Sequence, residues 1–452
     1  MSSNSLIYSN KLAFVVIFII ICALVIDTSI IKVYYLNVQQ PSSSSISNVI
    51  VFIIISAIYM VGQYYVLGYV NKKSSEIGDY NKKLHIKVLH KALTIVQYGL
   101  TAINIFVIVQ MYTISRYNVA SLIAVCTISY GLSIVLMVII AQRFFSWFRS
   151  NRNHVVLLYG LSSAVIGINA VFSLFYVAYM LFLNQPTFIR PHLGFFTPFF
   201  IPTPLTVTLN SGYVASSIAS FIISWAATAV LLRHYSRKLG AIRYWIIVCL
   251  PLIYFLLQFQ PLFLNLFLPL SQSQPILFST LYTLIFTMSE VVGGILFGIA
   301  FWLIAKDIRH STTVRNYMIM SAFGFVLLFV SNQAIVLISA PYPPFGLPTA
   351  SLMGLSSYLI LIGIYSSAVS ISQDINLRKS IRKATQQQPQ LLSDIGIAQM
   401  QKELEKRVMK IVKEDSDAMI KETGIMPSMS EVDVKEYLDN VLAAIETYKK
   451  ER

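Results

Sequence analysis

Long apolar stretches, separated by short polar and basic connections, dominate the first 372 residues of the chain. A helix needs about 20 predominantly apolar residues to cross the hydrocarbon core of a bilayer. The pattern predicts ten such helices, at residues 12–31, 49–70, 93–113, 119–141, 155–183, 213–232, 244–268, 278–304, 317–338 and 351–372. The expected fold class is therefore all-α, a polytopic membrane helix bundle of about ten transmembrane helices formed by residues 1–372.

Residues 373–452 are expected to form a separate cytoplasmic tail with two amphipathic helices. Apolar residues recur there at spacings of three and four, first at Ile397, Met400, Leu404, Val408 and Ile411, then at Val434, Leu438, Val441, Leu442, Ile445 and Tyr448. Gly424 and Pro427 separate the two stripes. Each stripe is the nearest partner for the other, so the sequence predicts a helical hairpin. A contact with a partner helix or a second copy is the alternative.

Composition and charge agree with a membrane protein. Of the 452 residues, 56% are hydrophobic and only 12% are charged, against roughly 25% charged in a soluble domain. The net charge of +15 belongs to residues 1–372, because the tail holds equal numbers of acidic and basic residues. The basic residues cluster in the connections 71–92, 142–154, 233–243 and 305–316. The positive-inside rule then places these connections and both termini on the cytoplasmic side of a cell membrane. Because this rule accounts for the basic clusters, the charge gives no reason to expect nucleic-acid binding.

The opposite face is expected to carry an aromatic loop. The connection 184–212 contains five prolines, five phenylalanines and a single charged residue, Arg190. Its aromatic rings could cap the bundle at the lipid boundary or form a docking surface for an external partner. The candidate docking residues are Phe195, Phe196, Phe199 and Phe200, after Phe188 at the start of the loop.

A carboxylate is expected near the middle of the eighth predicted helix. Glu290 shares a helix face with Thr283, Thr287, Gly294 and Gly298. A carboxylate inside a membrane is costly, which makes it a functional hypothesis, here a proton-exchanging group beside a quinol, ion or solute. A neutral glutamic acid that is hydrogen-bonded between helices is the alternative. The Gly294-xxx-Gly298 spacing also predicts close approach of a neighbouring helix.

Other polar residues in the predicted helices are fewer. Gln97, Thr101 and Asn104 share one face of the third helix and are plausible partners for Glu290, although polar contacts between helices would explain them equally. Asp27 lies one turn from the end of the first helix, where we expect an interfacial polar residue.

Recognisable catalytic and haem motifs are missing from the sequence. None of the six histidines falls in a predicted span, so paired imidazoles for a membrane haem are not expected. No P-loop, CxxC pair or GxSxG motif occurs. These observations favour a membrane subunit without catalytic activity of its own and without a bound cofactor or metal.

The overall profile, with about ten spans, a chain rich in Ser, Ile and Tyr, no intramembrane haem ligand pair and an outer face without carboxylates, resembles the hydrophobic B subunit of the cytochrome b558/566 complex of thermoacidophilic archaea. The resemblance implies a non-haem subunit of an electron-transport complex that docks a haem-bearing partner on the outer face, with quinol as a further candidate partner. A secondary transporter with five-plus-five helices and Glu290 as coupling carboxylate is the alternative.

Overall fold

The structure is a computed structural model of the whole chain. The residues that it describes are 10–36, 45–74, 80–184, 187–189, 203–257, 259, 269–270, 273–274, 277, 281, 288–308, 311–339, 342–374, 377–378, 391–423, 433 and 437.

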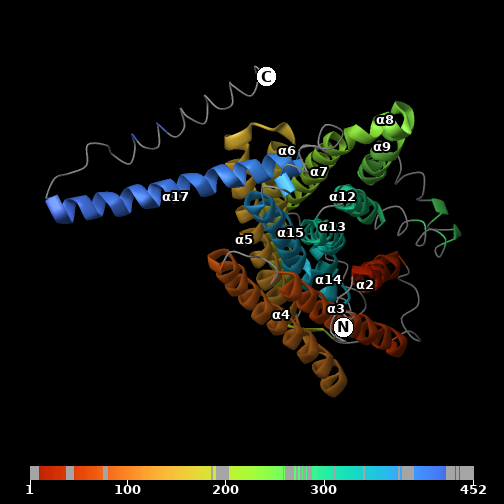
Figure 1. Cartoon of the computed structure of the whole chain (residues 1–452). Helices are drawn as coiled ribbons and strands as arrows, with labels where there is room; N and C mark the ends of the chain where they lie inside the picture. Colours follow the sequence, from red (N-terminus) through yellow and green to blue (C-terminus); the bar gives the residue numbers. More distant parts are fainter. Residues whose placement is uncertain are drawn as a thin grey trace.

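Within these residues, the fold is a bundle of α-helices (Figure 1), which confirms the predicted fold class. Nine long helical segments are apolar enough to cross a membrane. Their helices are α2 (Asn10–Leu36), α3 (Ser45–Ser74), α4 (Tyr80–Ile114), α5 (Val119–Asn151), α6 (His154–Asn184), α7 (Pro204–Leu232), α12 (Met288–Asp307), α13 (Thr312–Ser331) and α15 (Met353–Gln373). The shorter elements are η1 (Arg233–Tyr235), α8 (Ser236–Leu239), α9 (Ala241–Leu257), η3 (Ala334–Ser339), α14 (Leu347–Ser351) and the strands β1 (Tyr117–Asn118) and β2 (Phe188–Ile189).

The predicted seventh and eighth spans match the structure only in part. The seventh, 244–268, begins within α9, a helix of 17 residues that contains Pro251, and most of its second half lies outside the described residues. The eighth, 278–304, corresponds from Met288 onward to α12, and residues 282–287 also lie outside the described part.

Two helices occupy the centre of the bundle. In the most apolar windows of the segments Thr312–Ile338 and Leu347–Gln373, 82% and 94% of the residues are buried within the protein, more than in any other described span. Their close contact depends on Gly363 of α15, where an added Cβ would lie 2.5 Å from the carbonyl oxygen of Tyr317 in α13. The helices that surround this pair present large apolar side chains outward, among them Phe18, Ile54 and Phe106, as expected for surfaces in lipid.

The predicted close approach at the two glycines of α12 is confirmed. A Cβ on Gly298 would lie 2.8 Å from the carbonyl oxygen of Ala322, and one on Gly294 would lie 2.9 Å from the Cβ of Phe329. Both contacts belong to α13. Small residues at this spacing let the two helix backbones pack against each other.

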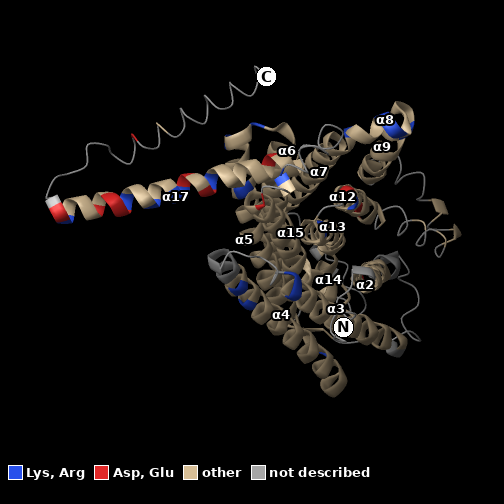
Figure 2. Ribbon diagram, in the orientation of Figure 1, with Lys and Arg blue, Asp and Glu red and all other residues tan. Residues whose placement is uncertain are grey.

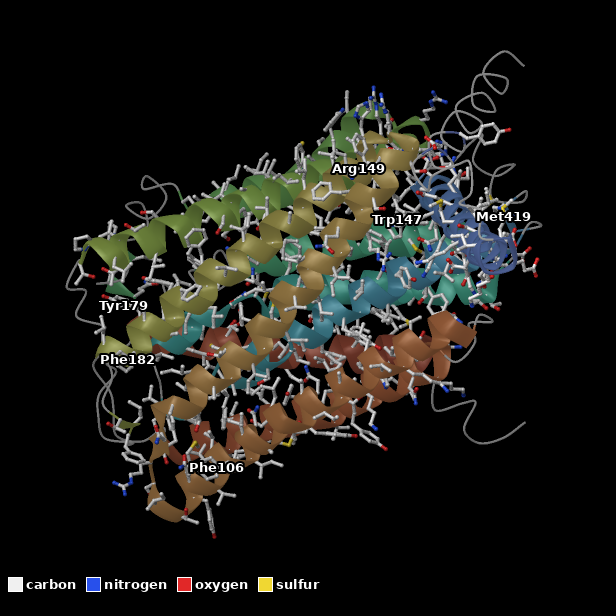
Figure 3. All side chains as sticks on the ribbon, turned by 90° about the vertical axis from the view of Figure 1, so that its left-hand side faces the viewer. Phe106, Trp147, Arg149, Tyr179, Phe182 and Met419 are labelled. Carbon is white, nitrogen blue, oxygen red and sulfur yellow. The ribbon has the colours of Figure 1, made fainter. Side chains whose placement is uncertain are left out.

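The two ends of the bundle differ in chemistry. Figure 3 shows Trp147 and Arg149 at the end where α17 (Leu391–Thr423) lies, and Tyr179 and Phe182 at the opposite end. Lys and Arg residues lie mainly near helix ends and along α17, while most of the bundle ribbon carries no charged residue (Figure 2). We refer below to these two ends as the α17 end and the aromatic end.

The first tail helix, α17, docks on the bundle. The face that it buries there is not the predicted apolar stripe. The N-terminal part of α17 packs on α15 and α5, and its buried residues are Leu391, Leu392, Ile395, Gly396, Ala398 and Gln399. Leu404 and Ile411 of the predicted stripe are 48% and 56% exposed. The remainder of α17 extends beyond the bundle (Figure 1). The second helix of the predicted hairpin falls almost entirely outside the described residues.

Polar contacts fasten α17 to the ends of the bundle helices. The indole N–H of Trp147 donates to Gln399 Oε1 at 3.1 Å, and Lys402 Nζ donates to Ser146 Oγ at 2.6 Å. Asn153 also donates to the carboxylate of Asp394. The start of the tail is therefore a structural part of the membrane domain.

Candidate functional site

A break in the last spanning segment creates a polar region inside the bundle. Gly346 has a φ of +88°, a left-handed conformation that favours glycine, and the five-residue helix α14 follows it directly. After Leu352 the chain continues as α15. The short helix packs against α2, α3, α4, α5 and α13. Its polar side chains and backbone groups are thereby presented to five spanning helices.

Asp27 of α2 lies on one side of α14 and is fully buried. The hydroxyl of Thr349 donates to Asp27 Oδ2 at 2.5 Å, and the backbone N–H of Thr349 donates to the same oxygen at 3.3 Å. The backbone of Gly346 also interacts with this carboxylate. Asp27 lies three residues before the end of the span Leu12–Ile30, so its interfacial position stays a prediction. The packing of α14 against α2 covers the carboxylate, which the sequence did not indicate.

Gln97 and Asn104 of α4 lie against Ser351, near the end of α14. Asn104 Nδ2 donates to the hydroxyl of Ser351 at 3.2 Å and to the carbonyl oxygen of Leu100 at 3.0 Å. Gln97 Nε2 lies 3.5 Å from the carbonyl oxygen of Ser351. Both amide side chains are fully buried.

Helix α3 extends this polar region. Gln63 donates through Nε2 to the hydroxyl of Thr101, and Thr101 in turn donates to the carbonyl oxygen of Gln97 at 2.9 Å. The Tyr59 hydroxyl lies beside Thr101 and Ser351. Gln63 and Tyr59 are each only 1% exposed, so the region is closed to solvent in this conformation.

Helix α5 holds the break from another side. The hydroxyl of Ser129 donates to the carbonyl oxygen of Ala350 at 2.7 Å and accepts from the backbone N–H of Gly354 at 3.3 Å. These two bonds satisfy backbone groups that the helix break would otherwise leave without a partner.

These contacts define two groups of buried polar side chains, one around Thr349 and one around Ser351, joined through α14, and we call them together the α14 polar cluster. Its members are Asp27, Tyr59, Gln63, Gln97, Thr101, Asn104, Thr349 and Ser351. It combines one carboxylate, three amides and four hydroxyls inside membrane-spanning helices. Such groups can exchange protons with a solute, hydrogen-bond it or hold a cation. Elsewhere in the described chain, as here, no group of three His, Cys, Asp or Glu residues could hold a metal ion.

Glu290 lies apart from this cluster. It is the third described residue of α12 and is partly exposed. Because residues 282–287 lie outside the described part, its position near the middle of a span stays a prediction. Helix α12 packs on α13, α9 and α7, and Glu290 interacts electrostatically with Tyr213 of α7. Its expected neighbours Thr283 and Thr287 fall outside the described residues. The sequence suggested that Gln97 and Asn104 contact Glu290. In the structure, both amide side chains contact Ser351 of α14.

A second buried amide, on another side of the bundle, has all its polar atoms paired. Asn169 of α6 donates to Ser216 Oγ at 3.1 Å and to the carbonyl oxygen of Tyr213 at 3.3 Å. Its Oδ1 accepts from Asn332 Nδ2 at 2.9 Å. Asn169 therefore shows how a buried amide is satisfied by protein groups alone.

One histidine lies within a spanning segment, although the sequence predicted none there. His90 falls within the spanning part of α4, Ile86–Ile114, because that helix begins earlier than predicted. Its Nδ1 lies 3.1 Å from the hydroxyl of Tyr358 in α15. The contact joins two helices, and no second histidine shares it among the described residues.

The predicted connection 184–212 is described at its beginning and its end, and its last residues, 204–212, belong to α7, which begins earlier than predicted. Phe188 and Ile189 form β2, which pairs antiparallel with Tyr117 and Asn118 of β1 at the aromatic end. The guanidinium of Arg116 lies 4.7 Å from the ring centroid of Phe188. The candidate residues Phe195, Phe196, Phe199 and Phe200 lie outside the described residues.

The length and apolar surface of the bundle define the chain as a helical multi-pass membrane protein. Comparisons with family models, with curated proteins and with solved structures give no match to it.

Proposed function

We propose that this chain is a secondary transporter whose substrate or coupling ion binds at the α14 polar cluster. The observation that carries the proposal is Asp27, a fully buried carboxylate inside a spanning helix, bonded by Thr349 at a helix break. Burial of a carboxylate in a membrane is costly and is kept where it serves an ion or proton pathway. Transporter sites are typically built where a spanning helix is interrupted, as it is between α14 and α15.

Asp27 takes the coupling role that the sequence suggested for Glu290. A coupling group must lose and regain a proton or a cation within the bundle, so it needs neighbours that hold it in both states. Asp27 has the hydroxyl and the amide N–H of Thr349. Glu290 lies on α12, outside the α14 polar cluster, and is partly exposed. The two carboxylates therefore give a natural pair of test and control variants.

The test is electrical recording from proteoliposomes adsorbed on a solid-supported membrane. A panel of amino acids, organic acids, sugars and amines is applied under a fixed proton or sodium gradient. We expect a transient current with at least one compound, lost in Asp27→Asn and retained in Glu290→Gln. Correctly folded protein that gives no current with any compound would contradict transport. Current that persists in Asp27→Asn would show that coupling runs elsewhere.

A second candidate function is that of a non-haem membrane subunit in an electron-transport complex. The observation that favours it is the β1–β2 pair, which fixes the first residues of the aromatic loop to the bundle beside Arg116. A fixed base allows the following phenylalanines to present one surface to a partner, since the entropy cost of ordering the loop is reduced. On this proposal the haem belongs to the partner on the outer face, and quinol is a further ligand. Both termini then lie on the cytoplasmic side of the cell membrane.

Purification from native membranes in mild detergent tests this second function. We expect a haem protein to accompany the chain and to be lost when Phe195 and Phe196 are both changed to Ser. A chain that purifies without any haem absorbance would contradict this role, and equal haem content in the double variant would exclude the loop as the main contact.

A further inference from the structure

The orientation of two amides in the α14 polar cluster is fixed by backbone carbonyl groups. Asn104 directs its NH₂ group to the carbonyl oxygen of Leu100, and Gln97 directs its NH₂ group to that of Ser351. A carbonyl oxygen only accepts hydrogen bonds. Turning either amide around would place two oxygen atoms against each other, so Gln97 Oε1 and Asn104 Oδ1 must point away from these carbonyls.

The orientation of the third amide, that of Gln63, follows from a chain of two hydrogen bonds. The hydroxyl hydrogen of Thr101 is used in the bond to the carbonyl oxygen of Gln97. Thr101 can therefore only accept from Gln63, which must present its NH₂ group to that hydroxyl. Gln63 Oε1 is consequently turned away from Thr101, as the other two amide oxygens are turned away from their carbonyls.

All three amide oxygens are buried, and none has a hydrogen-bond donor within the described part of the chain. Their residues are at most 1% exposed. Buried polar atoms are nearly always satisfied, as in Asn169, although the amide oxygens of Asn332 and Gln333 also lack a donor among the described residues. The α14 polar cluster thus offers three neutral oxygen acceptors, and the carboxylate of Asp27 is bonded to the same short helix α14.

We propose that the α14 polar cluster binds a monovalent metal cation of the sodium class. Hard cations take oxygen ligands, and amide carbonyls are among the groups that replace their water shell. One carboxylate balances one positive charge, which favours a monovalent over a divalent ion. The lack of thiolate or imidazole in the cluster disfavours a transition metal. The inference deepens the proposed transport function by naming the coupling ion, but binding can be measured without transport.

The test is the thermal unfolding of the detergent-purified full chain in NaCl, LiCl, KCl or choline chloride at constant ionic strength and constant pH. A ligand that binds only the folded state raises the apparent Tm in a saturable way. We expect one of the three metal ions to raise the Tm by several degrees over choline, with the radioactive ion binding at about one per chain. No metal ion effect over choline would overturn the proposal, and so would stabilisation that follows pH alone.

Matched amide variants locate the site. Asn104→Leu and Gln97→Met keep side-chain size and remove one acceptor oxygen each, and we expect either change to abolish the metal-ion shift. Asn169→Leu is the control, since its oxygen is already bonded to Asn332. It should lower the Tm in every salt and retain the shift. Retention of the shift in both cluster variants would place the ion elsewhere and overturn the assignment.

Two further measurements keep the outcome interpretable. If Asn104→Leu does not fold, Asn104→Asp supplies a charged oxygen in place of the amide and should tighten metal-ion binding. If the wild-type chain binds the ion while no compound gives current, the cation site stands and the transport proposal fails. If current is observed without any dependence on metal ions, transport stands and the cation site fails.

Discussion

The hydroxyl of Thr349 donates a 2.5 Å hydrogen bond to the carboxylate of Asp27, although 322 positions separate the two residues in the chain. The bond joins the first described spanning helix to the break that precedes the last one. Both residues are fully buried. A polar bond of this kind in a bundle interior fixes the relative position of two helices, since neither group can be satisfied by lipid.

Removing this hydroxyl should destabilise the bundle. Thr349→Val keeps the shape of the side chain and leaves Asp27 with the weaker backbone bond at 3.3 Å. Loss of a hydrogen bond to a buried charged group costs about 1.5–3 kcal/mol. We expect a lower unfolding free energy in detergent by this amount, measured by denaturant titration, and near wild-type stability for Thr349→Ser. Equal stability of the valine variant and wild type would show that the bond contributes nothing.

Gly363 should tolerate no side chain. Gly363→Ala places a methyl group 2.5 Å from the carbonyl oxygen of Tyr317, and backbone atoms cannot move aside as a flexible side chain does. We expect separation of α13 from α15 and loss of folded monodisperse protein in size-exclusion chromatography. The control is Gly131→Ala in α5, where the added Cβ meets nothing within 4 Å. Its higher helix propensity should stabilise by about 0.5–1 kcal/mol.

The buried face of α17 should decide whether the tail stays docked. Ile395 is 1% exposed, whereas Ile411 on the projecting part is 56% exposed. Ile395→Asp buries an unpaired charge and should release the helix, seen as faster hydrogen–deuterium exchange over residues 391–403. Ile411→Asp should leave that exchange unchanged. If both variants behave alike, the docked arrangement of α17 is wrong.

Acid should strengthen the docking of α17. Burial raises the pKa of Asp394 above its ordinary value of 3.8, against the opposing hydrogen bonds from Asn153 and Asn151. A raised pKa means that the docked state binds the proton more tightly, so this stabilisation is complete below pH 3.8 and is lost as the pH rises through the raised pKa. Exchange over residues 391–403, corrected for intrinsic rates, should therefore slow on acidification. Asp394→Asn should remove this dependence, and the exposed Asp417→Asn should retain it.

The sequence predicted the fold class because membrane-spanning helices carry a strong local signal. Apolar runs of sufficient length identify spans one at a time, and the Gly294-xxx-Gly298 spacing correctly indicated a close helix contact. The residues of α17 that the bundle buries differ from the apolar stripe expected to pack on a second tail helix, a pairing that lies outside the described residues. An amphipathic stripe indicates which face prefers burial, but Ile395 and Ala398 are buried by α15 and α5, elements that are distant in sequence.

The candidate site was predicted only in part. Gln97 and Asn104 were selected from a shared helix face, but their contact with Ser351 depends on a break in the last span that no motif marked apart from Gly346 and Pro348. Asp27 was assigned to the membrane interface because, within a single helix, the distance of a residue from the helix end is the only sequence signal of its depth in the membrane. Its burial results from the packing of α14, which is a tertiary property.

Accessibility of Ser351 from the two sides of the membrane tests the central claim most directly. A transporter must expose its site to each side in turn, whereas a static bundle keeps it closed. The single-cysteine variant Ser351→Cys, with the three native free cysteines replaced, is reconstituted in vesicles and treated with a membrane-impermeant thiol reagent from either side. Its control retains only native Cys126, which is fully buried in α5. The account predicts labelling of Ser351→Cys from both sides and none of Cys126; no labelling of Ser351→Cys from either side would contradict it.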